Sequence, residues 1–222
     1  MKIKAIIFDL DDTLSDRNLC LKNFSDKFVE NYSSYIKEPQ SEHIVQQIKI
    51  SDRNGYRNKE EMFQEILDVL PWENKPTISD LIEYRNREFV NCTVGMKGME
   101  EVLKTFKGMG VKLGIITNGS ISEQSKKIEK LNIRSYFDSV IISDAVSIKK
   151  PDRRIFQLSL DELGVNAEEA IYVGDHPSND VVGALDAGLD AIWLKGQEEW
   201  NIEYVIPDKI AIRLEDLIDL VG

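Results

Sequence analysis

The feature that most constrains the fold is a repeated alternation between short apolar runs and amphipathic segments of helical length. Apolar runs with strand character recur at residues 4–8, 111–116, 139–142, 170–173 and 191–194. Apolar residues at helical spacing occur between the later runs, over residues 98–106, 120–131, 152–163 and 178–187. Strands that alternate with helices form βαβ units, in which successive strands are parallel. The alternation therefore predicts an α/β fold with a parallel sheet.

Residues 16–94 break this alternation. Apolar residues there recur at helical spacing in four successive blocks, and Thr77-x-x-Asp80 has the form of a capping box for the last block. We therefore expect an all-helical domain over residues 16–94, inserted into an α/β domain that comprises residues 1–15 and 95–222.

Charge and composition exclude several classes of protein. The 222 residues carry a net charge of −11, which argues against partners such as nucleic acid or an anionic membrane. The chain shows neither a signal peptide nor an apolar run of about 18 residues, the length that a membrane-spanning helix needs. Cys20 and Cys92 form no metal-spaced pair, which indicates free thiols in a reducing compartment. We expect a cytoplasmic protein, either a monomer or a homodimer.

The first apolar run ends in a cluster of acid, Asp9-Leu10-Asp11-Asp12. Side chains two residues apart on a strand point to the same side, with Cα atoms about 6.5 Å apart. At an effective dielectric near 20, two unit charges roughly 6 Å apart repel by about 3 kcal/mol. A cation, a shared proton or ample water must therefore offset the repulsion between the Asp9 and Asp11 carboxylates.

Three further apolar runs are each followed by a polar motif. Because the carboxyl ends of parallel strands lie at the same edge of a sheet, these motifs would lie close together there. They are Thr117-Asn-Gly-Ser120, Lys149-Lys-Pro-Asp152 and the stretch from Gly174-Asp175-His176 to Asp180. Each has an ordinary interpretation alone, as a helix cap, a solvated lysine or a turn. Taken together, two acidic clusters could hold a hard divalent cation, and a lysine and a threonine hydroxyl could bind a phosphoryl group beside it.

Two other kinds of ligand site do not fit the sequence. An EF-hand loop starting at Asp9 needs glycine at its sixth position and glutamate at its twelfth, where this chain has Leu14 and Cys20. Gly108-Met-Gly110 resembles a dinucleotide loop, but it precedes its strand and so indicates a turn.

The four motifs, in this order and strand context, resemble those of the haloacid dehalogenase superfamily across nearly the whole chain. The resemblance implies a Rossmann-like parallel sheet as the core. It also implies that residues 16–94 are the small helical cap of the subgroup that carries its insertion after the first motif.

The resemblance implies a role for each reactive residue. Asp9 would be the nucleophile that forms an aspartyl-phosphate, and Asp11 would protonate the leaving oxygen and then deprotonate the hydrolytic water. Thr117 would bind the phosphoryl group, with help from the backbone around Asn118. The family places its lysine directly before proline, which favours Lys150 over Lys149 as the residue that neutralises charge.

A magnesium site is implied as well. Mg²⁺ would be held by the carboxylates of Asp9 and Asp175 and by the backbone carbonyl of Asp11. Asp180 would support either the metal site or the lysine. His176 stands where many relatives carry serine, and we expect an ordinary loop histidine there.

The superfamily includes dehalogenases and mutases as well as phosphatases. A halide leaves without a proton, whereas an alkoxide needs one, so Asp11 favours a phosphatase over a 2-haloacid dehalogenase. Asp12 argues only modestly against a sugar-phosphate mutase, in which glycine is commoner at that position. A catalytically silent regulatory module is the remaining alternative, although no motif residue is missing. We expect an Mg²⁺-dependent phosphatase acting on a small phosphorylated metabolite.

One segment of the helical insertion is a candidate for substrate selection. Residues 51–58 interrupt the helical spacing, and Asn54-Gly55 is a strong turn signal. We expect Arg53, Tyr56 and Arg57 to bind substrate there, since arginine suits anionic groups and tyrosine offers an aromatic face. The alternative is a solvated loop whose arginines offset nearby acids.

Overall fold

The computed structural model describes residues 3–196, 199–200, 203 and 207–221. The chain divides into two units. The α/β unit consists of Met1–Asp16 and Val94–Gly222, and the helical unit consists of Arg17–Thr93. Among the described residues, no helix has the length and apolar character needed to cross a membrane.

A parallel sheet with the order β3-β2-β1-β4-β5-β6 forms the centre of the α/β unit. Its strands within the described residues are β1 (Ala5–Phe8), β2 (Lys112–Thr117), β3 (Ser139–Ile142), β4 (Ala170–Gly174), β5 (Asp190–Leu194) and β6 (Ile210–Ala211). The parallel α/β fold predicted from the alternation is therefore confirmed. The two-residue strand β6 was not predicted.

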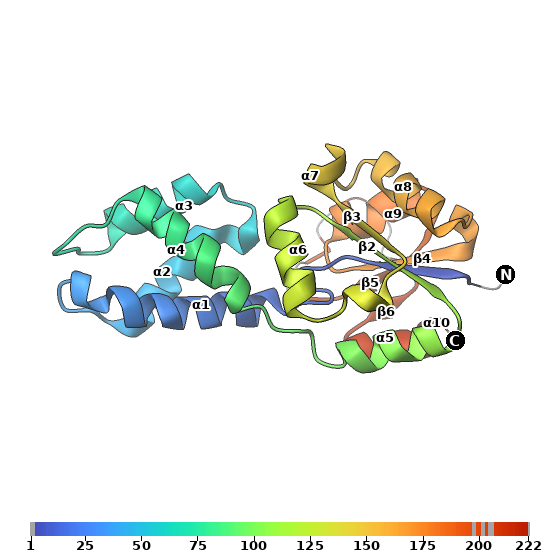
Figure 1. Cartoon of the computed structure of the whole chain (residues 1–222), viewed down its shortest axis with the longest axis horizontal. Coiled ribbons are helices and arrows are strands. Elements are labelled where there is room, and N and C mark those ends of the chain that lie inside the picture. Colours follow the sequence, from blue (N-terminus) through green and yellow to red (C-terminus); the bar gives the residue numbers. More distant parts are fainter. Residues whose placement is uncertain (1–2, 197–198, 201–202, 204–206, 222) are drawn as a thin grey trace. The chain divides into compact units, whose positions relative to one another are not determined.

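Helices cover both faces of this sheet. The helices of this unit within the described residues are α5 (Met99–Gly108), α6 (Ile121–Lys130), α7 (Ser143–Val146), α8 (Arg153–Leu163), α9 (Gly183–Asp186) and α10 (Leu217–Val221). A π-helix over Pro177–Val182 precedes α9, and 3-10 turns lie at Arg134–Tyr136, Ala167–Glu169 and Leu214–Asp216. Figure 1 shows α5 and α10 on one side of the sheet and α8 and α9 on the other.

The alternation of side chains along β1 explains why both faces are covered. Ile6 and Phe8 belong to the apolar cluster that also contains side chains of α5, α6 and α10. Ala5 and Ile7 point the opposite way, into the cluster with side chains of α8 and α9. All four are fully buried, as is typical of a central strand in a parallel sheet.

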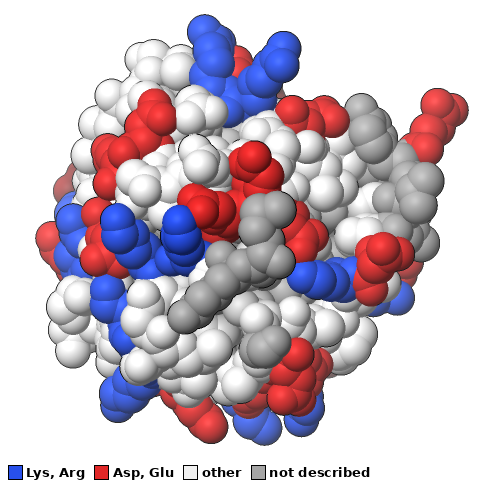
Figure 2. Space-filling view, turned by 90° about the vertical axis from the view of Figure 1, so that its right-hand side faces the viewer, with Lys and Arg blue, Asp and Glu red and all other residues white. Residues whose placement is uncertain are grey.

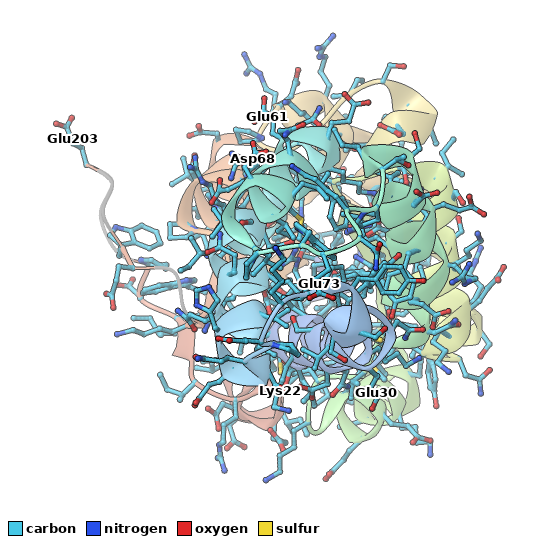
Figure 3. The ribbon with its side chains drawn as sticks, turned by 90° about the vertical axis from the view of Figure 1, so that its left-hand side faces the viewer. Lys22, Glu30, Glu61, Asp68, Glu73 and Glu203 are labelled. Atoms are coloured by element: carbon cyan, nitrogen blue, oxygen red, sulfur yellow. The ribbon has the colours of Figure 1, made fainter. Side chains whose placement is uncertain are left out.

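Four helices in Arg17–Thr93, a stretch described throughout, build the helical unit: α1 (Arg17–Tyr32), α2 (Ser41–Asp52), α3 (Lys59–Val69) and α4 (Ile78–Asn91). Helix α1 packs on α2 and α4, and α3 packs on the same two helices. Their shared core includes Phe24, Phe28, Phe63 and Phe89. Lys22 and Glu30 of α1 and Glu61 and Asp68 of α3 project outward in Figure 3, so these two helices each have one apolar and one charged side.

Local signals in the sequence explain several helix ends. The capping box of Thr77 and Asp80 is present at the start of α4, and the Ser120 side chain accepts from the Glu123 backbone N–H at the start of α6. Gly110, with φ of 75°, turns the chain before β2, as the glycine pattern predicted. In the helical unit, 3-10 turns lie at Ser33–Tyr35 and Arg53–Gly55, and the second joins α2 to α3.

Candidate active site

The candidate site lies at the carboxyl ends of three adjacent strands. Phe8 of β1 pairs with Ile115 of β2 and Val173 of β4, so Asp9 follows β1 directly where its neighbours also end. The Asp9 backbone N–H donates to the Val173 carbonyl at 2.9 Å and extends this pairing by one residue. Thr117 is the last residue of β2, and Asp175 follows β4. Side chains more than 160 residues apart in sequence therefore meet at one sheet edge.

The chain turns sharply after Asp9. The backbone N–H groups of Leu14 and Ser15 both donate to the Leu10 carbonyl, at 2.9 and 2.8 Å. This turn places Asp12 in the left-handed region, with φ of 57°, which aspartate tolerates better than most side chains. The turn leads the chain away from the sheet edge while Asp9 and Asp11 stay at its start.

Lys150 occupies the centre of the site. Its ammonium donates to Asp9 Oδ1, to Asp180 Oδ1 at 2.6 Å and to Tyr172 Oη at 2.9 Å. Lys150 is 3% exposed, whereas the neighbouring Lys149 is exposed to solvent. The structure thus brings to the site the lysine that stands directly before proline.

Asn118 holds the backbone of this lysine. Its side-chain amide donates to the Lys150 carbonyl at 3.1 Å and accepts from the Lys150 N–H at 2.9 Å. The pair of bonds joins the loop after β2 to the loop before α8. The side chain of Asn118 therefore positions Lys150, in addition to any contact that the surrounding backbone makes with a substrate.

The loop after β4 is fixed from several directions. The Asp180 side chain accepts from the His176 N–H at 3.0 Å, in addition to its bond with Lys150. A Cβ on Gly174 would lie 2.5 Å from Cβ and Cγ of Asp180, so only glycine allows this close approach. Trp193 of β5 donates to the Asp175 carbonyl at 2.8 Å.

His176 caps the π-helix. Its Nδ1 accepts from the backbone N–H groups of Ser178 and Asn179, at 3.2 and 3.1 Å. The Nδ1 atom of His176 is therefore engaged by the backbone of its own loop.

Excess negative charge dominates the electrostatics of the site. Burial raises the pKa of Asp9 to about 7, with Asp180 and Asp11 adding to the rise and Lys150 opposing it. Burial likewise raises the pKa of Asp175 well above its usual range, and the charges of Asp180, Asp9 and Asp12 raise it further. Burial alone would lower the pKa of Lys150, but the adjacent carboxylates of Asp180 and Asp9 outweigh it and keep the ammonium charged.

This arrangement fits a hard divalent cation. Asp9, Asp175 and Asp180 each offer a carboxylate oxygen, and the three oxygens lie within 4.8 Å of one another. One ammonium faces three carboxylates, which leaves two charges uncompensated when all three are ionised. Oxygen ligands and this excess charge suit Mg²⁺.

Two residues that the sequence analysis missed bind Asp11 and Thr117. Gln124 Nε2 lies 3.0 Å from Asp11 Oδ2 and 2.5 Å from Thr117 Oγ1, and Lys127 Nζ lies 2.9 Å from both carboxylate oxygens of Asp11. Both come from the inward face of α6. A signal was present, because Gln124 and Lys127 share helical spacing with the buried Ile128 and so occupy positions where a core helix usually carries apolar residues.

The three candidate residues of the helical unit differ in their surroundings. Arg57 is bound to Glu65 through Nη1, and its side chain is 16% exposed. Arg53 is exposed, and Tyr56 is 64% exposed. Within its unit, Arg57 is thus engaged by a carboxylate, while Arg53 and Tyr56 present most of their surface to solvent.

Comparison with known proteins identifies the class. The family model for haloacid dehalogenase-like hydrolases matches residues 6–194, and the chain belongs to that family. It is 32% identical over 197 residues to the glyceraldehyde 3-phosphate phosphatase of Pyrococcus abyssi, covering 87% of this chain and 82% of the relative. It is also 32% identical over 141 residues to the pyrimidine 5'-nucleotidase YjjG of Escherichia coli, covering 61% of this chain and 62% of the relative.

Solved structures show the same fold. The magnesium-bound HAD-hydrolase YfnB from Bacillus subtilis superposes with a TM-score of 0.79 at 20% identity, with all of both chains covered. A 2-haloacid dehalogenase from Pseudomonas syringae also superposes, with a TM-score of 0.62, 23% identity, and coverage of 99% of this chain and 98% of the other. Proteins of different named activities share this fold, so the chemistry has to be inferred from the site.

Proposed function

We propose that the protein is an Mg²⁺-dependent phosphatase that hydrolyses a small phosphomonoester through an aspartyl-phosphate on Asp9. The observation that carries the proposal is the close grouping of the Asp9, Asp175 and Asp180 carboxylates, of which Asp9 and Asp180 bond a single ammonium, with Asp11 and Thr117 nearby. The trio has the charge and the oxygen donors to bind Mg²⁺, and Asp9 is the carboxylate that follows the central strand. Relatives named as glyceraldehyde 3-phosphate phosphatases and as a phosphoserine phosphatase support the same class.

The first step transfers the phosphoryl group to the enzyme. A carboxylate oxygen of Asp9 attacks phosphorus as the bond from phosphorus to the leaving oxygen breaks, and the Asp11 carboxyl gives its proton to that oxygen. Lys150 stabilises negative charge on Asp9 and on the phosphoryl oxygens, and Thr117 donates its hydroxyl to the phosphoryl group. The alcohol then departs as a neutral molecule.

The second step regenerates Asp9. Water attacks phosphorus, the Asp11 carboxylate takes a proton from that water, and the bond between phosphorus and Asp9 breaks to release inorganic phosphate. Asp9, Asp175 and the Asp11 carbonyl would hold Mg²⁺, and Asp180 would bind it directly or hold Lys150. When bound, Mg²⁺ supplies positive charge that offsets the repulsion between the carboxylates and the substrate.

The helical unit is proposed as the cap that selects the leaving group. Its candidate contacts are Arg53 and Tyr56, with Arg57 contributing if it is released from Glu65. The relatives' named substrates include a triose phosphate, a nucleotide and pyrophosphate, so the curated names leave the substrate open within phosphorylated metabolites. We further propose that the enzyme acts in the cytoplasm as a monomer or homodimer.

A substrate panel tests the function. Phosphate release would be measured with p-nitrophenyl phosphate, glyceraldehyde 3-phosphate, pyrimidine nucleoside 5'-monophosphates, phosphoserine and pyrophosphate. We expect hydrolysis that EDTA abolishes, that Mg²⁺ restores and that Ca²⁺ inhibits, because Ca²⁺ accepts a looser coordination. Full activity in EDTA would contradict the metal site. Halide release from a 2-haloacid with no phosphate release would indicate a dehalogenase, and the absence of both would indicate a silent module.

A further inference from the structure

Helix α6 buries polar side chains where a helix against a sheet normally buries apolar ones. Ser120 fixes the start of the helix, so the direction in which each later residue points is set from its first turn. Gln124, Lys127 and Ile128 are 2%, 3% and 2% exposed. Ile128 joins the apolar core, whereas the other two reach toward Asp11. Burying an ammonium and an amide is costly unless both are well bonded, so their contacts require an explanation.

The ammonium of Lys127 binds both oxygens of the Asp11 carboxylate. The distances from Nζ to Oδ1 and Oδ2 are equal at 2.9 Å, and Glu123, one helical turn earlier, lies 3.3 Å from the same ammonium. Contact with both oxygens fixes the position of the carboxyl group. Ser15 donates a further hydrogen bond to Oδ1 at 3.1 Å.

Gln124 links Asp11 to the phosphoryl-binding threonine. Its amide nitrogen donates to Asp11 Oδ2 at 3.0 Å and lies 2.5 Å from Thr117 Oγ1. A Cβ on Gly119 would approach Cγ of Gln124 to 3.0 Å, so the loop after β2 closes tightly on this side chain. The separation between the Asp11 carboxyl and the Thr117 hydroxyl is therefore set by one rigidly packed amide.

From these contacts we propose that Lys127 and Gln124 are positioning residues for Asp11, a role that rests on the proposed phosphatase function. They hold its carboxyl group in one orientation at a fixed distance from Thr117, so that it meets the leaving oxygen of a phosphoryl group bound there. Neither residue exchanges a proton with the substrate. Their effect is on the step in which Asp11 protonates the leaving group.

Two substrates of nearly the same shape isolate this step. Phenyl phosphate and p-nitrophenyl phosphate differ by one nitro group, but the p-nitrophenolate departs readily without a proton while the phenolate depends more on one. The constant kcat/KM covers the reaction only through release of the phenol. The ratio of the two kcat/KM values also cancels the concentration of folded enzyme, so a variant that folds poorly still gives a usable result.

In Lys127→Met, we expect kcat/KM for phenyl phosphate to fall about 10- to 100-fold more than that for p-nitrophenyl phosphate, since general acid catalysis contributes about 10²–10⁴-fold. Gln124→Met should shift the ratio in the same direction by less. Lys127→Arg keeps the charge and should restore most of the ratio. Lys126→Met removes an exposed lysine from the same helix and should leave the ratio unchanged.

A double variant shows whether the effect passes through Asp11. Asp11→Asn should change the ratio as Lys127→Met does, and adding Lys127→Met to it should change the ratio no further. Equal losses on both substrates in Lys127→Met and Gln124→Met would overturn the proposal and leave a purely structural role. If Lys127→Met yields no soluble protein, the ratio in Gln124→Met decides. Wild-type protein that hydrolyses neither phosphate would instead contradict the proposed function.

Discussion

The α/β unit and the helical unit both bury charged side chains, but they compensate them differently. In the helical unit Arg17 bonds both oxygens of Asp52, at 3.0 and 2.8 Å, and Arg57 is paired with Glu65. In the α/β unit the ammonium of Lys150 bonds two carboxylates, Asp9 and Asp180, and a third carboxylate, Asp175, lies within 4.8 Å of both. A buried ion pair is compensated within the fold, whereas an excess of buried charge of one sign marks a place where an ion or a reacting group belongs.

Asp9→Asn should produce the largest effect, on activity. An amide cannot attack phosphorus, so we expect turnover to fall by at least about 10³-fold, as happens when an enzyme loses its nucleophile. The fold should survive, because removing one charge from a crowded group relieves repulsion. Thermal unfolding in EDTA should show a melting temperature no lower than that of wild type. Retention of a tenth of the activity would contradict the covalent mechanism.

The same kind of substitution in the helical unit should act on stability. Asp52→Asn leaves the Arg17 guanidinium, whose side chain is 9% exposed, without its carboxylate. Breaking such a buried pair costs about 3–5 kcal/mol of the free energy of unfolding. Urea unfolding would measure the loss, and hydrogen exchange followed by mass spectrometry would locate it within residues 17–93.

Two controls sharpen this test. Asp26→Asn breaks an exposed pair with Lys22 on the same helix, α1, and should cost at most about 0.5 kcal/mol. The double variant Arg17→Met with Asp52→Leu removes both charges and should recover most of the stability. If Asp52→Asn and Asp26→Asn cost the same, the contrast between the two units would be wrong.

Metal binding to the clustered carboxylates should depend on pH. Since the pKa of Asp9 is raised to about 7, protons compete with Mg²⁺ for this carboxylate below about pH 7. A carboxyl whose pKa rises on folding stabilises the metal-free fold below its unfolded pKa, and that stabilisation is lost as the pH rises through 7. The increase in melting temperature on adding Mg²⁺ should therefore be larger at pH 8 than at pH 5.5. An equal increase at both values would contradict this assignment.

The smallest expected effect concerns the exposed side chains of the helical unit. Arg53→Ala should raise KM for the physiological substrate several-fold and change KM for p-nitrophenyl phosphate far less, because a small aryl phosphate needs few contacts with a cap. Lys49→Ala, at another exposed position of the same unit, is the control. Equal losses on both substrates, or none on either, would make Arg53 an ordinary surface residue.

The regular spacing of apolar residues predicted the fold well, because a long apolar pattern shows directly which side chains are buried. It failed where an element is too short to show a period, as in the two residues of β6. The prediction from apolar spacing was also imperfect where the helical geometry changes. Residues 178–187 were expected as one helix, and the chain instead forms a π-helix to Val182 followed by α9.

Motifs led to the residues that follow strand ends, because the topology of a parallel sheet brings those positions together. Tyr172, Gln124 and Lys127 lie inside regular elements, where a polar residue is normally taken for a surface position. Their contacts with Lys150 and Asp11 depend on how a strand and a helix face the sheet edge. Only three-dimensional packing fixes that direction.

The turn after the first strand has a further consequence at Asp12. Glycine would adopt its φ of 57° freely, whereas aspartate adopts it at a conformational cost of about 1 kcal/mol. In return the position contributes a further acidic group, and its charge helps to raise the pKa of Asp175. Glycine and aspartate at this position would therefore give the same backbone path but different electrostatic potentials. Position 12 tunes how strongly the acidic site attracts cations, independently of the shape of the loop.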